Sequence, residues 1–322
     1  MDRYENRPGK SDVLGGFIIK KRANNSTEIS GVWNAVFVLI LFAAVIITVV
    51  PLINVIIVSF SHKDSFAIKG YSFFPTAWSL EGYRYLFRFG QQLWRGYIVS
   101  IVYSISGTLL SLTLMSTYAY VLWQRNFPAR RFFTWYMFVT MLFSGGLVPS
   151  YIIITQYLHI NDSFLIFLFN ALVSGYSVII LRTFLKTTIQ ESLVEAALID
   201  GAGHFRIFIQ IVLPLFKAGL ATIGLFGVVA RWNDWFTAVL YINKPELTPL
   251  QTVLYRMQEK VAFLVQNAAF ASTPDGQEMI RTLPSINLNM ACAVATVIPI
   301  LIAYPFFQQF FQRGLLVGSI KE

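Results

Sequence analysis

The chain has 322 residues, of which 56% are apolar, 13% are charged and one is a cysteine, and its formal net charge is +9. Charged residues are about half as frequent as the roughly 25% of a soluble domain, and the mean hydropathy is +0.60. These values exclude disordered, collagen-like and disulfide-rich proteins and indicate a membrane protein with several spans. The basic residues lie mostly between apolar stretches, so orientation in the membrane explains the charge and nucleic acid is not expected as a partner.

Six apolar stretches are candidates for helices that cross the hydrocarbon core, which takes ~20 residues. In chain order they are residues 32–60, 97–122, 132–158, 164–181, 218–242 and 290–311. The first and third contain Pro51 and Pro149, which we expect to act as kinks. The sequence therefore predicts an all-α integral membrane domain over residues 32–322.

Residues 1–31 form a polar leader of mixed charge. The leader lacks the apolar run and the cleavage site of a signal peptide, so we expect the first span to be retained. Apolar residues beside Lys20-Lys21-Arg22 form either a short helix at the membrane surface or part of a solvated basic tail.

The short connections between spans predict the orientation, because they follow the positive-inside rule best. Arg125, Arg130 and Arg131 lie between the second and third spans, whereas residues 159–163 contain no Lys or Arg. Both termini are therefore expected in the cytoplasm. Residues 182–217 then form a cytoplasmic loop.

The same orientation places two long loops, residues 61–95 and 243–289, outside. In the first loop, Ser79 is expected to cap a short helix that carries Leu80, Tyr83 and Phe87 on one face. In the second, residues 250–265 are expected to be helical.

Motifs for enzymatic chemistry are missing from the sequence. It has no Gly-x-x-x-x-Gly-Lys-Ser/Thr loop for phosphates, no metal-ligand spacing and no Gly-x-Ser-x-Gly nucleophile elbow. Its three histidines are far apart, and Cys292 lies in an apolar stretch. We therefore predict that the chain is not an enzyme and binds no metal.

The 182–217 loop contains a short helix with clear limits. Ser192 and Glu195 fit a capping box at its start, and Gly201 permits the left-handed conformation that ends a helix. Leu193, Val194, Ala197 and Leu198 are expected to line one side. A second helical piece is expected to run to Leu213, where Pro214 interrupts it. An isolated helix this short is marginal in water, so it requires a partner surface, either in this chain or in another subunit.

This loop closely resembles the cytoplasmic signature of permease subunits of ABC importers. That signature reads Glu-Ala-Ala, three residues, Gly, nine residues, Ile-x-Leu-Pro, and it is matched by Glu195-Ala196-Ala197, Gly201, Ile211, Leu213 and Pro214. Trp232-Asn233, Tyr304-Pro305-Phe306 and residues 313–321 resemble carbohydrate-importer permeases, in particular the subgroup that takes up complex oligosaccharides. The resemblance runs from about residue 32 to the end of the chain.

The resemblance implies a type I ABC-importer permease with six transmembrane helices and a short cytoplasmic coupling helix, in the inner membrane of a prokaryote. Its partners would be a second, unlike permease, two ATPase subunits that carry ATP and Mg, and an extracytoplasmic sugar-binding protein; this chain would hold no cofactor. The substrate would be an oligosaccharide, and pectin or alginate fragments fit the subgroup.

The resemblance further implies that the short helix docks on an ATPase subunit. The residues assigned to this coupling are Ser192, Glu195, Ala196, Ala197, Leu198, Asp200, Gly201, Leu213 and Pro214. In the alternative interpretation, Ser192 and Glu195 only cap the helix, Gly201 only ends it, and Pro214 only starts the next span. Both interpretations can hold together, because a docking helix must first be folded.

A second candidate site lies in the fifth span, where ionisable residues are costly and face a cavity or a partner. Arg231 and Asp234 are three residues apart and are expected to pair, although Arg231 could instead bond backbone carbonyls. Trp232 and Trp235 offer flat faces that suit sugar rings, and Asn233 offers a donor and an acceptor. The alternative is that these residues hold helices together. Asn170, Ser174 and Tyr176 in the fourth span are weaker pathway candidates.

Two other classes of function compete with an ATP-driven importer. An ion-coupled secondary transporter would favour ionisable relays within spans and inverted repeats, but the spans contain Asp234 as the one acidic candidate and no repeat is visible. A membrane-embedded enzyme is disfavoured by the missing catalytic motifs.

Overall fold

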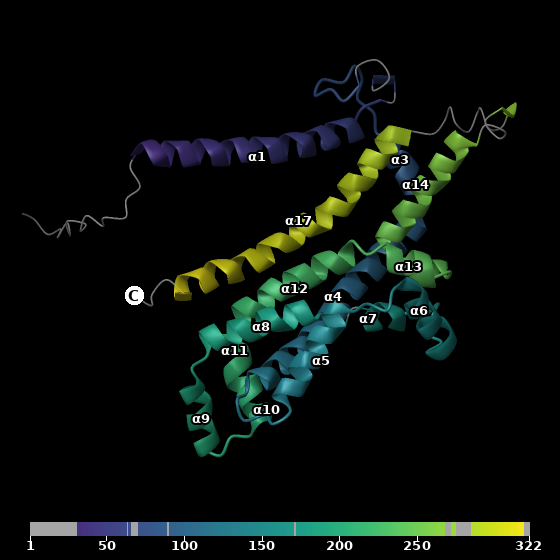
Figure 1. The fold of residues 1–322 in the computed structure, drawn as a ribbon. Coiled ribbons are helices and arrows are strands. Elements are labelled where there is room, and N and C mark those ends of the chain that lie inside the picture. Colours follow the sequence, from purple (N-terminus) through teal and green to yellow (C-terminus); the bar gives the residue numbers. More distant parts are fainter. Residues whose placement is uncertain are drawn as a thin grey trace, which may run out of the picture. The chain divides into compact units, whose positions relative to one another are not determined.

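The computed structural model describes residues 31–62, 64–65, 70–88, 90–170, 172–267, 272–274 and 285–318 (Figure 1). The leader, residues 1–30, therefore lies outside the described residues. The chain divides into two units between Pro51 and Leu52. No strand occurs in the described ranges, which contain a single isolated β-bridge between Ser61 and Trp78.

The described elements are almost entirely helices. In chain order they are α1 (Gly31–Ser59), α3 (Glu81–Arg88), α4 (Gly90–Trp123), α5 (Arg130–Leu142), α6 (Leu147–Ile152), η1 (Ile153–Tyr157), α7 (Leu165–Phe169), α8 (Gly175–Thr188), α9 (Glu191–Ile199), α10 (His204–Ile207), η2 (Phe208–Val212), α11 (Leu213–Leu215), α12 (Lys217–Trp232), α13 (Phe236–Tyr241), η3 (Pro245–Leu247), α14 (Leu250–Gln266) and α17 (Ser285–Gly318). The all-α prediction is confirmed for these residues, and α14 confirms the helix expected over 250–265.

Three helices of the described residues are long and apolar enough to cross a membrane. They are Val32–Ser59, Gly90–Trp123 and Asn287–Pro305. Two bent pairs, Arg130–Leu142 with Leu147–Tyr157 and His204–Leu215 with Lys217–Trp232, raise the number to five if each pair is one span. The structure thus does not show the six predicted stretches as six continuous helices.

The third stretch is interrupted at a different position from the one predicted. The chain turns by 110° between Leu142 and Leu147, before Pro149 rather than at it. Gly146 has a φ of 86°, which glycine adopts without steric cost. Pro149 lies in the first turn of α6, where its missing N–H removes no helical hydrogen bond.

The fourth stretch is divided between α7 and α8. The helix ends at Asn170, which has an extended backbone, and α8 starts after Ser174, whose hydroxyl accepts from the N–H of Ser177 at 3.4 Å. The apolar composition concealed this break, because Ser174-Gly175 is short and the residues around it remain apolar.

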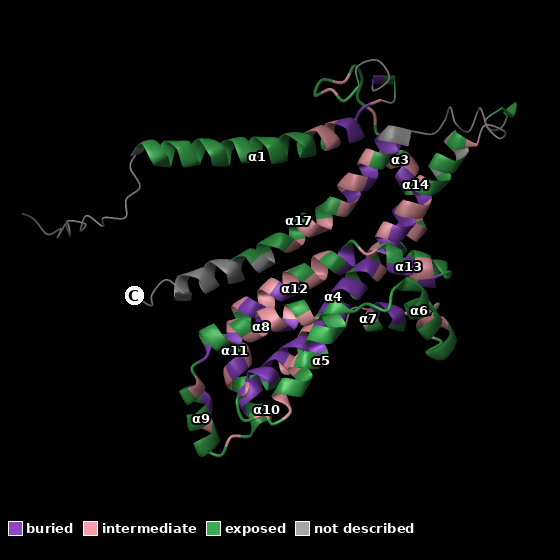
Figure 2. Ribbon diagram, in the orientation of Figure 1, coloured by how far each residue is buried: buried purple, intermediate pink, exposed green. Residues whose placement is uncertain are grey.

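Helix α4 is the centre of residues 52–318, since it packs against α12, α8, α14, α7, α5 and α3. Buried residues run along the whole of α4, whereas α1 is exposed over residues 32–51 (Figure 2). Apart from Asn34 and Thr48, the exposed side chains of α1 over these residues are apolar, as expected for a helix that lipid tails surround.

Three apolar clusters stabilise the second unit. One joins the carboxyl half of α4 to α5, α8, α9, α10, η2 and α12, a second joins α3, α4, α12, α14 and α17, and a third joins α4, α7 and α13. The first cluster connects the loop helix α9 directly to the helices of the membrane domain.

Helix α3 is held at a close approach to α17. Ser79 Oγ accepts from the N–H of Glu81, the first residue of α3, at 3.1 Å, so Ser79 supports the start of the helix from one residue before the N-cap position. Leu80 lies before the helix rather than on it, and the buried residues of α3 are Gly82 and Leu86, whereas Phe87 is exposed. A Cβ on Gly82 would lie 2.8 Å from the carbonyl oxygen of Asn287, so the helices meet at the glycine rather than at the aromatic residues.

Candidate functional sites

Helix α9 begins two residues earlier than the capping-box prediction requires. Its N-cap is Gln190, whose side chain makes no capping hydrogen bond, and Glu191 is the first helical residue. Ser192 therefore lies inside the first turn, where it cannot serve as the N-cap, and Glu195 is not at the position that would reach back to it. The expected capping box is wrong, because the extended chain at Ile189 and Gln190 fixes where the helix starts.

The other end of α9 confirms the role predicted for Gly201. Its φ is 81°, in the left-handed region. The N–H of Gly201 donates to the carbonyl of Leu198 at 3.0 Å, and the N–H of Ala202 donates to that of Ala197 at 2.9 Å. These two bonds are those of a Schellman motif, with Asp200 as the C-cap. Gly201 thus ends the helix in a defined direction.

Only one narrow side of α9 packs on its own chain. Val194 is 3% exposed and Ala197 packs against the same apolar cluster. Leu193 and Leu198, which the sequence places on this side, are instead exposed at 42% and 39%. Leu193 and Leu198 lie on either side of the strip formed by Val194 and Ala197, and the core reaches only that strip.

The exposed surface of α9 contains most of the residues predicted to couple. They are Ser192, Glu195, Ala196, Leu198, Asp200 and Gly201. Ile199, which was not among the predicted residues, is 86% exposed on the same helix. Figure 1 shows α9 near α10 and α11, away from α13 and α14. The helix is therefore a delimited, partly apolar surface at one end of the second unit.

An ion pair anchors the start of α9 to another connection. Arg125 Nε lies 2.9 Å from Glu191 Oε1, joining the segment between α4 and α5 to the first residue of α9. Sequence reasoning missed this contact, because the two residues are distant in the chain and neither belongs to a motif. The only signal was that both segments were predicted on the same side of the membrane.

Beyond α9, the chain passes through α10, the π-helical η2 and α11 before it turns into α12. Leu213 is half-buried beside the first cluster, and Pro214 lies exposed in the first turn of α11. The bend between Leu215 and Lys217 is 80°. The helix thus continues through Pro214 to Leu215, and the interruption that we expected at Pro214 lies two residues later, at Phe216, where the chain is redirected into α12.

Arg231 and Asp234 do not form the expected ion pair, which is not among the ion pairs of the described residues. Helix α12 ends at Trp232 and the backbone leaves helical geometry at Asn233, so the three-residue spacing does not put the two side chains on one helix face. Arg231 Nη1 donates instead to the carbonyl of Gly227 at 3.3 Å, and Nη2 donates to Ser111 Oγ.

Asp234 has partners of its own. Its Oδ2 accepts from the hydroxyl of Tyr103 at 2.8 Å, and its Oδ1 accepts from the N–H of Thr237 at 3.1 Å. The second bond stabilises the start of α13. Sequence reasoning missed Tyr103 and Ser111, although both lie on α4 among small and aromatic residues that suit close helix packing.

The two tryptophans near the break have different environments. Trp232 is 4% exposed, and its Nε1 donates to the carbonyl of Thr296 at 3.0 Å, so this ring packs between helices. Trp235 is 38% exposed and stacks on Tyr255 at a centroid distance of 4.3 Å. Asn233 is exposed, and its Oδ1 accepts from Gln251 Nε2 at 3.4 Å. Of these, Asn233 and Trp235 present accessible faces.

The fourth-stretch candidates flank the break between α7 and α8. Asn170 Nδ2 donates to Thr237 Oγ1 at 2.7 Å, which connects this break to the start of α13. Tyr176 is 66% exposed on the first turn of α8. The structure thus brings Asn170 close to the Asp234 region, whereas it gives Tyr176 no polar contact among those it records.

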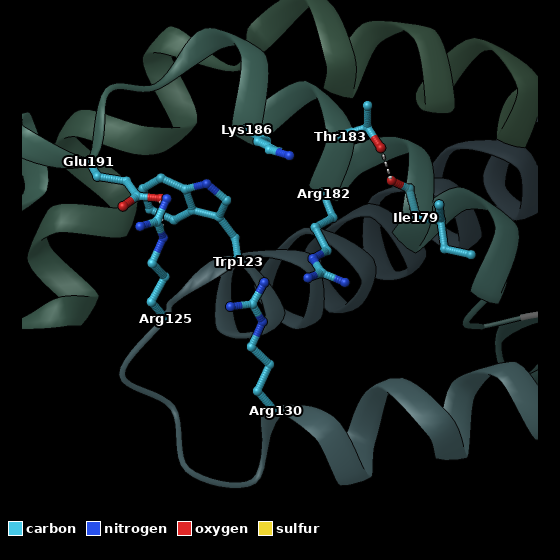
Figure 3. A pocket seen from close by; sticks show the side chains of 8 residues that line it. All are labelled: Trp123, Arg125, Arg130, Ile179, Arg182, Thr183, Lys186 and Glu191. Atoms are coloured by element: carbon cyan, nitrogen blue, oxygen red, sulfur yellow. Dashed lines mark hydrogen bonds and ion pairs between the residues drawn. The ribbon is translucent and has the colours of Figure 1, made fainter.

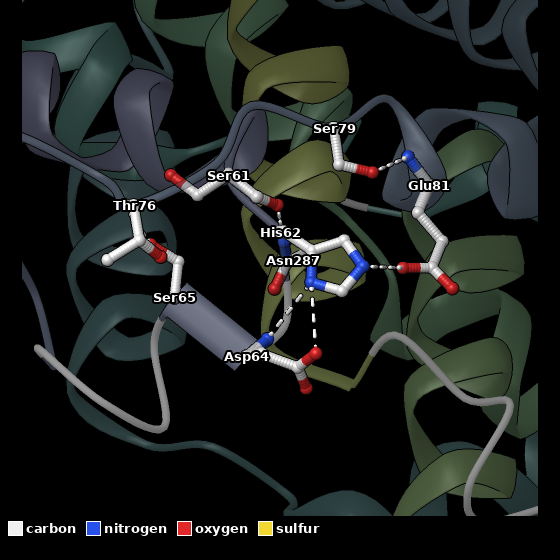
Figure 4. Close-up of polar contacts among 8 residues, drawn as sticks. All are labelled: Ser61, His62, Asp64, Ser65, Thr76, Ser79, Glu81 and Asn287. Atoms are coloured by element: carbon white, nitrogen blue, oxygen red, sulfur yellow. Dashed lines mark hydrogen bonds and ion pairs between the residues drawn. The ribbon is translucent and has the colours of Figure 1, made fainter.

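Two polar clusters hold the predicted outer loops. In the first, His62 Nδ1 lies 3.4 Å from Asp64 Oδ2 and Nε2 lies 3.9 Å from Glu81 Oε2, while Asn287 Nδ2 donates to the carbonyl of Ser61 (Figure 4). This cluster joins the start of the 61–95 loop to α3 and α17. No group of three metal-ligating side chains that could hold an ion occurs in the described part of the chain.

In the second cluster, Asp162 binds the segment that follows α13. Its Oδ1 accepts from the N–H groups of Asn243 and of Lys244, the latter at 3.1 Å, and Lys244 Nζ donates to the Asp162 carbonyl at 3.2 Å. The hydrogen bond from the N–H of Asn243 is the main reason why the pKa of the Asp162 carboxyl lies below its usual 3.8.

Known proteins share both the sequence and the fold. No protein-family model matches the chain. The permease protein YtcP of the polygalacturonan/rhamnogalacturonan transport system of Bacillus subtilis (strain 168) is 34% identical over 283 residues, which cover 88% of this chain and 95% of YtcP. Protein LplC of the same organism is 33% identical over 298 residues, covering 92% and 97%.

A solved structure agrees with these relatives. The crystal structure of a bacterial ABC transporter involved in the import of the acidic polysaccharide alginate contains a chain that superimposes with a TM-score of 0.72 at 26% identity. The match covers 87% of this chain and 96% of that one. With two relatives above 30% identity that align over nearly their whole length, the chain belongs to the permease proteins of sugar ABC transporters.

Proposed function

We propose that this chain is a non-catalytic membrane subunit of an ATP-driven importer for oligosaccharides and that α9 is its docking surface for an ATPase subunit. The observation that supports this most directly is the surface of α9. The helix uses Val194 and Ala197 for its own core and leaves Glu195, Ala196 and Ile199 exposed. A soluble loop helix with exposed apolar residues is typical of an interaction site.

The position of α9 suggests how nucleotide-driven motion would reach the membrane. Val194 belongs to the same apolar cluster as Val212 of η2 and Ile223 of α12. Packed side chains resist compression, so a displacement of α9 moves its neighbours rather than being absorbed. The motion would pass along η2 and α11 into α12, whose far end carries Arg231 and Trp232. Alternating access would then follow from movement of α12 relative to α4.

The substrate pathway in this proposal includes the break between α12 and α13. Asn233 and Trp235 supply an amide and an aromatic face there, and Asp234 supplies a carboxylate fixed by Tyr103. Arg231 and Trp232 act mainly by holding α12 against α4 and α17. Asn170 supports the start of α13, and Tyr176 remains a candidate only through its exposure.

The remaining assembly follows from the same proposal. The partners are a second, unlike permease, two ATPase subunits that bind ATP and Mg, and an extracytoplasmic sugar-binding protein. The chain would cross the membrane six times, with interrupted third, fourth and fifth spans, and both termini would lie in the cytoplasm. The basic Arg125–Arg131 connection supports that orientation.

Acidic oligosaccharides are the first substrates to test. The relatives include a permease named for polygalacturonan/rhamnogalacturonan and a structure named for alginate import. The purified complex in vesicles should take up oligomers of galacturonate, mannuronate or guluronate, but not an uncharged maltose oligomer of the same length, when ATP and the binding protein are supplied.

The same vesicles distinguish the proposal from ion-coupled transport. Uptake should require the ATPase subunits and should persist when an ionophore removes the ion gradients. Uptake that needs no ATPase subunit and stops with the ionophore would contradict the proposal and would assign the chain to secondary transport.

Ala196 provides a direct test of the docking surface. Ala196→Trp adds bulk to the exposed side of α9 and should prevent ATPase binding while the chain still inserts in the membrane. Phe205→Trp is the matched control, because it enlarges another exposed side chain of the same loop outside α9. ATPase co-purification with Ala196→Trp at the level of the control would contradict docking at α9.

A further inference from the structure

A pocket of about 330 Å³ lies between the α4–α5 connection and α8 (Figure 3). Its charged lining consists of Arg125, Arg130, Arg182, Lys186 and Glu191. Arg130 at the start of α5 and Arg182 on α8 extend toward each other across the pocket, and Arg125 and Glu191 form its wall beside α9.

The positive charge of the pocket exceeds its negative charge. Glu191 is its one acidic residue, and this carboxylate is paired with Arg125. Arg130, Arg182 and Lys186 take part in none of the ion pairs of the described residues. Arg130 and Arg182 also lie close enough for their charges to repel each other. An anion between them would remove that repulsion.

The available groups select the kind of anion. Arg and Lys only donate hydrogen bonds, and the hydroxyl of Thr183 already donates to the carbonyl of Ile179 at 2.9 Å. The pocket therefore suits a ligand that has several acceptor oxygens and no hydrogen-bond donors of its own that the pocket would have to satisfy. A phosphate group fits, because two guanidinium groups and an ammonium from two different helices can each bind a separate oxygen.

The sequence after Arg130 indicates the depth of the pocket in the membrane. Phe132, Trp135 and Tyr136 follow on α5 and are 67%, 62% and 60% exposed. Exposed Trp and Tyr residues gather at the membrane interface, where headgroup phosphates lie. Basic pockets between helices at this level bind anionic lipid headgroups.

We infer that this pocket binds a phosphate group and that its source is the headgroup of an anionic phospholipid. The site is separate from the exposed side of α9 and from the break at Asp234. Only the choice of the cytoplasmic leaflet rests on the proposed orientation. Bound lipid would hold α5 against α8 next to the Arg125–Glu191 contact.

Native mass spectrometry of the delipidated, assembled complex tests the inference. The complex is titrated with phosphatidylglycerol, with phosphatidylcholine of the same acyl chains, and with inorganic phosphate. The unmodified complex should retain phosphatidylglycerol in preference to phosphatidylcholine. Arg130→Gln with Arg182→Gln should weaken retention of phosphatidylglycerol by roughly tenfold or more.

Arg131→Gln with Lys217→Gln is the matched control, because it removes two exposed charges that do not line the pocket. The control should retain phosphatidylglycerol as the unmodified complex does. Equal weakening in both double variants would overturn the inference, because it would show a general charge effect. The absence of any preference for phosphatidylglycerol would overturn the lipid source.

The inorganic phosphate arm identifies a soluble source. If inorganic phosphate binds the unmodified complex but not the Arg130→Gln with Arg182→Gln variant, the phosphate site is supported. If the complex then also shows no preference for phosphatidylglycerol, free phosphate is the ligand. If the unmodified complex binds neither lipid nor inorganic phosphate, the site is refuted. All of these measurements are independent of sugar uptake, so a failure here does not affect the importer proposal.

Discussion

The hydroxyl of Tyr103 donates to Asp234 Oδ2 at 2.8 Å, across 131 positions of the sequence. Tyr103 lies on α4 and is 2% exposed, and Asp234 lies where α12 gives way to α13. The carboxylate also accepts from the N–H of Thr237 at 3.1 Å. The interruption in the fifth stretch is therefore held in place by the central helix of the unit.

Tyr103→Phe should lower the melting temperature of the detergent-solubilised complex. It removes a hydrogen bond to a carboxylate, and such bonds contribute about 1.5–3 kcal/mol. Tyr97→Phe is the matched control on the same helix, because its hydroxyl donates at 2.8 Å to the neutral carbonyl of Ala295, a bond worth about 1 kcal/mol. Equal shifts in the two variants would argue against a special role of Asp234.

Gly201→Val should abolish sugar-stimulated ATPase activity without preventing membrane insertion. Space is not limiting, since a Cβ on Gly201 would meet nothing within 4 Å, but the φ of 81° is strongly disfavoured for valine. The helix end would change direction and α9 would present a different surface.

Gly203→Val serves as the control for that variant. A Cβ on Gly203 is equally unobstructed, and its φ of −72° with a ψ of 155° suits valine. The control should keep its stimulated activity. Normal stimulation in Gly201→Val would show that the left-handed position is not needed for coupling.

Gly82→Ala should destabilise the complex even though alanine is the better helix former by about 1 kcal/mol. The added Cβ would lie 2.8 Å from the carbonyl oxygen of Asn287, and backbone atoms cannot move aside without separating α3 from α17. Gly90→Ala, where nothing lies within 4 Å, should be neutral or stabilising. A raised melting temperature for Gly82→Ala would show that α3 and α17 leave room for a Cβ at this contact.

Asp162→Asn should lower stability at neutral pH, and the difference from the unmodified chain should disappear in acid. Hydrogen bonds from Asn243 and Lys244 hold the pKa of Asp162 below 3.8, so the folded state favours the charged carboxylate. Stability from this group is therefore complete above the unfolded pKa and is lost as the pH falls through the lower folded pKa.

Melting temperatures of the two proteins measured across the acid range check this prediction. The gap between them should be constant from neutral pH to about pH 5 and should close below the ordinary Asp pKa of about 3.9. Asparagine keeps one acceptor oxygen and tolerates the φ of 51° at this position, so the comparison isolates the charge. A gap that does not change with pH would show that the charge is unimportant.

The helix α9 shows how much of a local element can be predicted from sequence and where that prediction fails. The end at Gly201 was predictable, because a left-handed residue after a helix is a local steric requirement. The start was not, because Ser192 and Glu195 fit a capping box equally well in the sequence. In the structure the extended backbone at Ile189 and Gln190 sets the start, and the residues that follow it, Glu191 and Val194, contact distant segments that sequence spacing does not reveal.

The fifth stretch shows the same limit for the pathway candidates. Spacing suggested that Arg231 and Asp234 pair, since the prediction assumed a helix through Asn233. The helix ends there instead, and the two charges find Ser111 and Tyr103 on α4. Likewise, the sequence could not show that Trp232 is buried and Trp235 half-exposed, because the direction of each side chain depends on where the helix ends.

The sequence by itself determined the membrane class, the all-α fold and the signature of residues 195–214, because hydropathy, helix termination and motif spacing are local properties of the chain. Only the tertiary structure decided where the third, fourth and fifth stretches break and which polar groups meet at those breaks. In an apolar chain, hydropathy is nearly the same on both sides of a break. The polar groups exposed by an interrupted helix must be satisfied by other helices, so their partners are fixed by packing rather than by sequence spacing.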